Sequence, residues 1–452
     1  MNPLPLVSHT DPDAVIAWRN GQPVSVRRFL ADVARVAARL PDCKHLLNAC
    51  SDRYRFAVGF CAALASGRVS LLPSTYTPDT LRHLAEFAPG CQVLTDGDPA
   101  ALPLPAVVFP PLDEAGPAAG APFAVPRIAP DRLAAWVFTS GSTGTPVPHR
   151  KSWGLLVANV RAEAAALGLD PARPATLVGT VPPQHMYGFE STVLLALQNG
   201  AAFDAGRPFY PADIAAALAR TRAPAVLVST PFHLRMLLDE GIALPAAELL
   251  LSATAPLPEE LARRAEAAFD APLMEIYGST ETGQVAIRRT AEGATWTLFP
   301  GVRLDERDGQ TWASGGHIEV PVPLSDVIER IDERRLLLKG RNADLVNIAG
   351  KRTSLGWLNR QLLAIPGVRD GAFHLPDDDG GAQVTRLAAF VVAPGLGARE
   401  VLAGLRQRVD PVFLPRPLIL LDALPRNATG KLPRTECEAL LAAHGSAREL
   451  RS

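Results

Sequence analysis

The feature that most constrains the fold is a long alternation of short apolar strands with helical segments. Its first half places these elements in turn at residues 14–18, 26–40, 46–49, 54–66, 69–73, 77–87 and 92–95. The alternation resumes at residues 133–138, 151–167, 175–180, 189–199, 227–230, 233–239 and 248–252. Because strands joined through helices run parallel, this order predicts an α/β fold whose sheet is covered by helices on both faces.

The pattern changes in the last third of the chain. Short alternating strands at 286–322 predict a small, mainly antiparallel β subdomain. Residues 102–130 are rich in Pro, Ala and Gly, and we expect an irregular surface connection there. We therefore predict a large domain at residues 1–340 and a small α+β domain at 341–452, with a hinge near 341–344.

Composition excludes several classes of protein. The chain has 452 residues and a formal net charge of −1, so electrostatics do not indicate a nucleic-acid partner. Its five cysteines form no C-x-x-C pair, which argues against a zinc site and suits a reducing cytoplasm. We see neither a signal peptide nor an apolar run long enough for membrane insertion.

A loop rich in hydroxyl groups and glycine follows the strand at 133–138. Residues 138–146 read Phe-Thr-Ser-Gly-Ser-Thr-Gly-Thr-Pro. Backbone N–H groups in such a loop can converge on an anion, and the hydroxyls add donors. An ordinary turn is the alternative, and the P-loop spacing is absent. The candidate phosphate ligands are Thr139, Ser140, Gly141, Ser142, Thr143 and Gly144.

Further motifs follow this loop in a fixed order. They lie at residues 277–281 (Tyr-Gly-Ser-Thr-Glu), 325–326 (Ser-Asp), 339–341 (Lys-Gly-Arg), 347–352 (Asn-Ile-Ala-Gly-Lys-Arg) and 425–431 (Pro-Arg-Asn-Ala-Thr-Gly-Lys). Together they resemble the AMP-forming adenylating enzymes: acyl- and aryl-CoA synthetases, luciferases and peptide-synthetase adenylation domains. The resemblance spans nearly the whole chain and implies an ATP-dependent acid ligase with a mobile C-terminal domain.

The resemblance also implies roles for the second motif. Glu281 would bind a Mg²⁺ that bridges ATP phosphates, as suits a hard cation. Thr280 would contact the α-phosphate, and Gly278 and Ser279 complete the nucleotide-binding turn. Tyr277 would flank adenine, although a tyrosine at the end of a strand can simply belong to the core.

Three later residues complete the implied nucleotide site. Asp326 would hold the ribose hydroxyls, and Arg341 would reach the ribose or the phosphates. Lys431 matches the family's catalytic lysine, whose ammonium joins the substrate carboxylate to the α-phosphate. Without the motifs around them, Asp326 would be a turn residue and Lys431 a surface lysine.

The segment 184–188 resembles the family's acid-binding loop. His185 would lie near the carboxylate, although a lone histidine can also be structural. Met186 stands where amino-acid-activating members carry an aspartate, which predicts an acid without an α-amino group, such as an aryl or fatty acid. The resemblance implies coenzyme A or the phosphopantetheine of an acyl carrier protein as acceptor. The residue 138–151 loop looks like that of aryl-polyene (xanthomonadin-type) ligases, which favours an aryl acid.

Some positions depart from the family pattern. The usual lysine of the phosphate loop is Val147, so His149, Arg150 or Lys151 would have to supply a cation. Ala343 also replaces a charged hinge residue. These departures leave an alternative open: a degenerate member that keeps the fold and binds nucleotide without catalysis.

Overall fold

The computed structural model describes residues 2–73, 75–112, 123–140, 146–221, 224–341, 345–348, 351–376, 386–427 and 430–449. The chain forms two compact units. The first comprises Met1–Asp305 and Trp312–Val322, and the second Glu306–Thr311 and Pro323–Ser452. The predicted hinge at 341–344 lies mostly outside the described residues, so the mobile domain at 341–452 stays a prediction.

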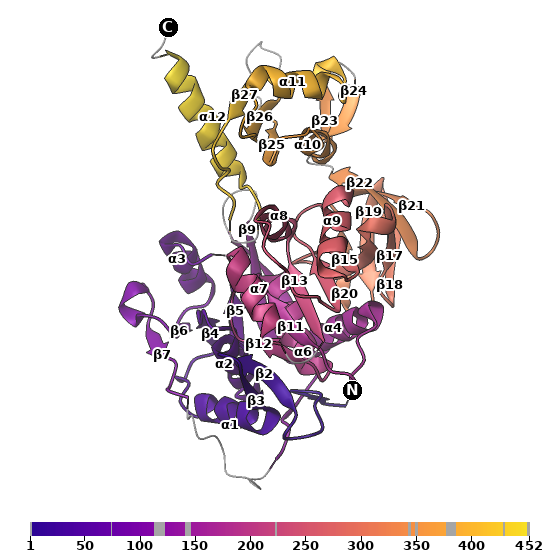
Figure 1. The fold of residues 1–452 in the computed structure, drawn as a ribbon. Coiled ribbons are helices and arrows are strands. Elements are labelled where there is room, and N and C mark those ends of the chain that lie inside the picture. The colour runs from indigo at the N-terminus through magenta and orange to yellow at the C-terminus, as the bar shows by residue number, and fades with distance from the viewer. Residues whose placement is uncertain are drawn as a thin grey trace. The chain divides into compact units, whose positions relative to one another are not determined.

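A six-stranded sheet opens the first unit (Figure 1). In spatial order its strands are β10 (Pro146–Ser152), β9 (Leu133–Ser140), β5 (Val69–Leu72), β4 (His45–Asn48), β6 (Gln92–Thr95) and β7 (Ala106–Val108). All neighbours run parallel except β10, which lies at the edge and runs antiparallel to β9. The predicted irregular connection at 102–130 contains β7 and β8 (Arg127–Ile128), and β8 pairs with β1 (Leu4–Pro5).

Strand β10 corrects one prediction. The sequence predicted a helix from residue 151, but β10 continues through Ser152, and α4 (Trp153–Leu167) begins at Trp153. Pro146 and Pro148 lack the N–H that a central strand needs, and edge strands tolerate such residues. The edge position explains how a segment with two prolines can pair with β9 through seven residues.

A second, larger sheet carries most of the remaining strands of this unit. In spatial order they are β17 (Thr295–Leu298), β16 (Gly283–Arg289), β15 (Leu273–Ser279), β14 (Leu249–Ser252), β13 (Ala225–Ser229), β11 (Thr176–Gly179), β12 (Ala202–Asp204), β2 (Val15–Arg19) and β3 (Gln22–Ser25). The middle of this sheet is parallel, and β16, β17 and β3 join it antiparallel. The predicted parallel α/β sheet is confirmed, while β16 and β17 extend it instead of forming a separate subdomain.

Helices cover these sheets. They are α1 (Val26–Ala37), α2 (Arg53–Ala65), α3 (Pro78–Phe87), α4, α5 (Met186–Gly188), the π-helix η2 (Phe189–Leu194), α6 (Leu195–Gln198), α7 (Pro211–Ala219), α8 (Pro231–Asp239) and α9 (Glu259–Phe269). Helix α2 is buried on almost every side, as expected for a helix without a polar face. Its Phe56 and Phe60 rings pack edge-on against Phe189 of η2, which joins the helices between the sheets.

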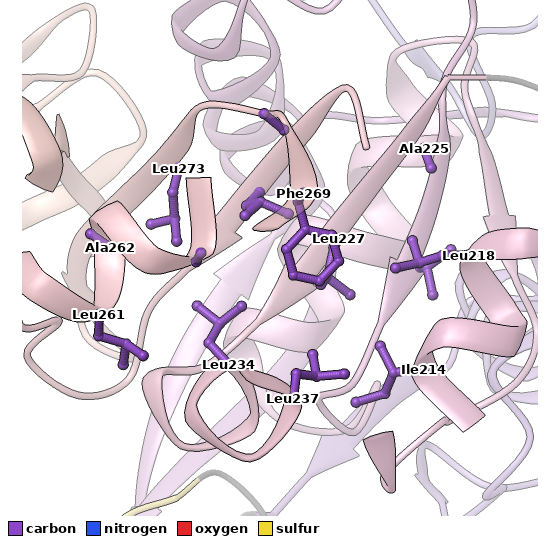
Figure 2. Close-up of a cluster of buried hydrophobic side chains, with 14 of the residues drawn as sticks. Ile214, Leu218, Ala225, Leu227, Leu234, Leu237, Leu261, Ala262, Phe269 and Leu273 are labelled. Atoms are coloured by element: carbon purple, nitrogen blue, oxygen red, sulfur yellow. The ribbon is translucent and has the colours of Figure 1, made fainter. Parts of the chain in front are cut away.

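One core cluster lies where α7, α8 and α9 pack against the larger sheet (Figure 2). Phe269 ends α9 and is fully buried, among apolar side chains that include Leu227 and Leu273 of the strands. Leu234 of α8 and Ile214 of α7 complete the same layer. This packing holds the three helices against strands β13, β14 and β15 of the larger sheet.

The rest of the chain forms a small sheet and the elements of the second unit. Strands β18 (Val302–Arg307), β19 (Gln310–Gly315) and β20 (Ile318–Pro323) form a three-stranded sheet. The second unit contains β21 (Asp326–Arg330), β22 (Arg335–Arg341), β23 (Leu345–Ile348), β24 (Lys351–Ser354), α10 (Leu355–Leu363), β25 (Asp370–His374), β26 (Ala388–Val392), α11 (Ala398–Arg406), β27 (Leu418–Leu420) and α12 (Arg434–Glu449). Short 3₁₀ turns lie at Pro99–Ala101, Thr290–Glu292 and Pro411–Phe413. Among the described residues, no helix has both the length and the apolar character to cross a membrane.

The core of the first unit also contains a carboxylic acid. Glu163 of α4 is fully buried, and neither of its carboxylate oxygens has a hydrogen-bond partner among the described residues. Burial raises the pKa of Glu163 to about 7, and the nearby Ser191 and Gln284 side chains offset only part of that effect. Glu163 is therefore held in its neutral form in weakly acidic solution.

Truncating the Phe269 side chain in the core of Figure 2 should destabilise the fold. We expect Phe269→Ala to lower the free energy of unfolding by about 3–5 kcal/mol, because it leaves a cavity in a packed layer. Urea titration followed by circular dichroism measures the change. Val320→Ala is the control, since Val320 is 64% exposed and its loss should change stability by less than about 0.5 kcal/mol. Equal effects of the two variants would contradict this packing.

Glu163 should make stability depend on pH. The pKa of Glu163 is higher in the folded than in the unfolded chain. Its contribution therefore favours the folded state most below the pKa of the unfolded chain, and the free energy of unfolding falls as the pH rises toward about 7. We expect Glu163→Gln, which cannot ionise, to gain stability relative to the natural protein between pH 5 and pH 7.5, by up to about 3 kcal/mol. Urea titrations at both pH values test this. A constant difference would show that Glu163 does not titrate in that range.

Candidate active site

Strands β9 and β10 bring together the two ends of the predicted phosphate loop. Ser140 pairs with Pro146, and Thr139 pairs with Val147. The loop residues Gly141, Ser142, Thr143 and Gly144, and the side chain of Ser140, lie outside what the structure describes. Thr139 is therefore the one predicted phosphate ligand of this loop whose side chain can be followed.

The three basic residues of β10 have different surroundings. The Arg150 guanidinium pairs with the carboxylate of Glu319. Lys151 is buried, and its Nζ donates to the main-chain carbonyl of Glu281 at 3.3 Å. His149 Nε2 lies 3.0 Å from Thr139 Oγ1 and 3.6 Å from Glu281 Oε1. Of the three, His149 is the side chain placed between the phosphate loop and the Glu281 carboxylate.

Burial lowers the pKa of His149, and the Glu281 carboxylate opposes that change. The imidazole is 18% exposed and the Glu281 side chain 37% exposed, so both can still meet a ligand. Sequence reasoning named His149 as one of three candidates but could not choose among them. The strand distinguishes the candidates, because alternate residues of β10 face opposite sides. His149 and Lys151 face one side of the strand and Arg150 faces the other.

Glu281 is carried by a tight turn between β15 and β16. The Ser279 backbone N–H donates to Thr282 Oγ1 at 3.1 Å, which closes the turn around Thr280 and Glu281. Gly278 is required there, because a Cβ at this position would lie 2.3 Å from the carbonyl oxygen of Gly283. The glycine of the Tyr-Gly-Ser-Thr-Glu motif thus lets the two strands approach closely enough to present the carboxylate.

Tyr277 lies on β15 just before this turn and is half-buried. Its ring contacts Trp296 of β17 edge-on, with the centroids 5.9 Å apart. The Arg288 guanidinium lies over the Trp296 ring, 4.4 Å from the ring centroid. The contact with Trp296 orients the tyrosine, which stays partly exposed, and its role beside adenine remains a prediction.

The predicted acid-binding loop is built on short local contacts. His185 caps α5, and its Nδ1 accepts from the backbone N–H of Tyr187 at 3.3 Å. The Gln184 amide donates to the carbonyl of Cys50, which anchors the loop to the six-stranded sheet. A Cβ at Gly188 would lie 2.1 Å from the Pro182 carbonyl oxygen, so the chain can reverse here only with glycine. His185 remains half-buried beside Met186, which is buried.

The remaining site residues belong to the second unit. Asp326 and Arg341 pair directly across the antiparallel strands β21 and β22, so the two residues predicted to contact the ribose are neighbours. The motif at 347–352 is shared between β23, which carries residues 347–348, and β24, which carries residues 351–352, and the two strands pair antiparallel. Residues 349–350, between these two strands, lie outside the described ranges.

Lys431 lies on an anchored loop. Its backbone N–H donates to Asn427 Oδ1 at 3.0 Å, and the lysine itself is exposed. Arg426 binds both carboxylate oxygens of Asp370 at 2.7 Å and donates to the Gly430 carbonyl at 3.0 Å. A bidentate, half-buried pair of this kind has a defined geometry. The chain therefore presents Lys431 on a support that is fixed within its own unit.

The comparisons with known proteins agree with these motifs. Residues 7–336 match the model of the AMP-binding enzyme family. A 4-coumarate–CoA ligase of Rhodobacter capsulatus is 34% identical over 297 residues, covering 65% of this chain and 73% of the relative. A 3-hydroxybenzoate–CoA/4-hydroxybenzoate–CoA ligase of Thauera aromatica is 26% identical over 375 residues, covering 70% of this chain and 68% of the relative.

The fold is matched as well. The crystal structure of ATP-bound MatB from Rhodopseudomonas palustris superposes with a TM-score of 0.79 at 21% identity, covering 95% of this chain and 96% of that one. The predicted family and α/β fold are confirmed, and the ligase is favoured over the degenerate alternative. The chain belongs to the AMP-binding enzyme family and is an AMP-forming acid–thiol ligase.

Proposed function

We propose that this ligase activates an aryl carboxylic acid with ATP and passes the acyl group to the thiol of coenzyme A or of a carrier-protein phosphopantetheine. The observation that carries the proposal is the convergence of Thr139, His149 and Glu281 beside the ends of the predicted phosphate loop. Relatives named for 4-coumarate and for hydroxybenzoates support an aryl acid. A cytoplasmic location would supply both ATP and the thiol.

The first step forms an acyl-adenylate. A carboxylate oxygen of the acid attacks the α-phosphorus of ATP, the bond to the bridging oxygen of the β-phosphate breaks, and pyrophosphate leaves. Thr139 and its loop would hold the phosphates, Tyr277 the adenine, and Asp326 with Arg341 the ribose. Lys431 would neutralise the charge that gathers between the carboxylate and the α-phosphate.

Glu281 fits the role of a magnesium ligand. The described residues include no cluster of three metal-binding side chains, so they offer no all-protein cage. Mg²⁺ bound with a nucleotide typically takes one or two carboxylates and completes its shell with phosphates and water. A single accessible carboxylate next to the phosphate loop matches that donor set, and Mg²⁺ there would neutralise phosphate charge.

The second step transfers the acyl group. The thiolate sulfur attacks the carbonyl carbon of the acyl-adenylate, the bond from that carbon to the phosphate oxygen breaks, and AMP leaves. Because the motif at 347–352 resembles the segment that faces the site for this step in the family, we assign residues of β23 and β24 to the thiol tunnel. His185, predicted to lie near the carboxylate of the acid, would orient that group.

A panel of acids tests the proposed substrate class. We expect Mg²⁺-dependent pyrophosphate release with hydroxybenzoates and hydroxycinnamates, weaker release with medium-chain fatty acids, and none with amino acids. Repeating the panel with and without coenzyme A separates the two acceptors, because a carrier-protein ligase should release pyrophosphate without forming an aryl-CoA. Amino acids as the best substrates would overturn the proposal, and no release with any acid would favour the degenerate alternative.

Lys431 should matter for adenylation alone. We expect Lys431→Ala to slow acid-dependent ATP–pyrophosphate exchange by about 10²–10³-fold, the loss typical of one electrostatic contact to a transition state. Thioester formation from a supplied acyl-adenylate should stay near the natural rate. Lys44→Ala, which removes an exposed lysine of the first unit, is the matched control. Equal slowing of both steps would argue against the assigned role.

A further inference from the structure

Lys151 is an unusual residue for the interior of a protein. It is only 9% exposed, although lysine is almost never buried unless its charge is paired. Its Nζ donates to the carbonyl oxygen of Glu281 at 3.3 Å, and this contact joins β10 to the turn that carries the Glu281 carboxylate. The same strand also presents His149 to that carboxylate. The Glu281 turn is thus held from one strand at both its main chain and its side chain.

The charge of Lys151 is balanced by acids from three elements. Burial lowers the pKa of the Lys151 ammonium, while Glu190 of η2 opposes this most strongly, followed by Glu281 and Glu319. Burial raises the pKa of Glu190, and Lys151 offsets part of that rise. Glu190 in turn accepts a hydrogen bond from the Asn159 amide of α4. Removing one of two buried groups of opposite charge is costly, because the other charge is then left uncompensated.

The same polar cluster touches the far side of the Glu281 turn. The Gln284 amide donates to Ser191 Oγ at 3.3 Å, next to Glu190 on η2. Gly283 has a positive φ of 72°, and a Cβ there would lie 3.3 Å from the side chains of Asn159 and His317. The residues that follow Glu281 are therefore packed against α4 and against η2, the helix that contains Glu190.

We propose that Lys151 is a positioning residue: it holds the Glu281 main chain and so sets the Glu281 carboxylate for the Mg²⁺ that accompanies ATP. The inference rests on the proposed function, because it takes Glu281 as the magnesium ligand. The family's loop lysine is missing at Val147, and the same strand, β10, supplies at Lys151 a cation that acts through the protein and not on the phosphates.

A purely structural ion pair is the competing explanation. If Lys151 only neutralises Glu190, removing both charges together should restore both stability and nucleotide binding. If Lys151 positions Glu281, the double variant should regain stability but not the magnesium dependence of binding, because the contact with the Glu281 carbonyl is still missing. Lys151→Met, Glu190→Gln and Lys151→Met/Glu190→Gln separate the two explanations.

The measurement is ATP affinity by isothermal titration calorimetry, with and without Mg²⁺ and without any acid, so that no turnover occurs. Urea titration of each variant measures stability in parallel. For the natural protein we expect tighter binding with Mg²⁺. Lys151→Met and the double variant should lose about 10-fold or more of that enhancement, as is typical when a group that orients a metal ligand is removed. Glu190→Gln should keep most of it.

Asp32→Asn provides the control for general damage. Asp32 of α1 is 2% exposed, accepts a hydrogen bond from Tyr54 of α2 at 2.8 Å and pairs with Arg35 on its own helix. Its variant should lose stability and keep the full Mg²⁺ enhancement. Enhancement that survives in both Lys151 variants overturns the inference while leaving the proposed function intact. Equal ATP binding by the natural protein with and without Mg²⁺ would overturn the proposed function, and the inference with it.

Discussion

The pairing of β9 with β10 is the constraint on which the rest of the site depends. It brings the two ends of the phosphate loop together and aligns Thr139 with Val147. Because β10 lies at the edge of its sheet, its side chains are free to contact the neighbouring turn between β15 and β16. One antiparallel ladder thus joins the part of the chain that would hold phosphates to the part that carries Glu281.

Much of this organisation could be predicted from the residues, and the exceptions have physical causes. The parallel sheet followed from strand–helix alternation, which reflects the connections that parallel strands require. Strand β10 was missed because Pro146 and Pro148 argue against a strand unless it lies at an edge, and edge position is a property of the tertiary fold. His149, Arg150 and Lys151 could not be ranked as cations for the same reason, since only the strand shows that Arg150 faces the opposite side from the other two.

In the second unit, too, the sequence predicted the motif residues but not the contacts that hold them. Motif order placed Asp326, Arg341 and Lys431 in one functional set, and the structure adds that Asp326 and Arg341 pair across β21 and β22. The bidentate contact of Arg426 with Asp370 supports the Lys431 loop. No local sequence pattern predicts this contact, because the two residues are 56 positions apart in sequence. The motifs predict which groups act on the substrate, whereas the residues that hold those groups in place are seen only in the fold.

The most direct test of the central claim is where the metal binds. A crystal of the protein grown with Mn²⁺ and a non-hydrolysable ATP analogue would locate the ion by its anomalous scattering. The predicted result is a peak within coordination distance of the Glu281 carboxylate, with His149 and Thr139 alongside the phosphates. A fully occupied metal–nucleotide complex whose ion has no contact with Glu281 would contradict it.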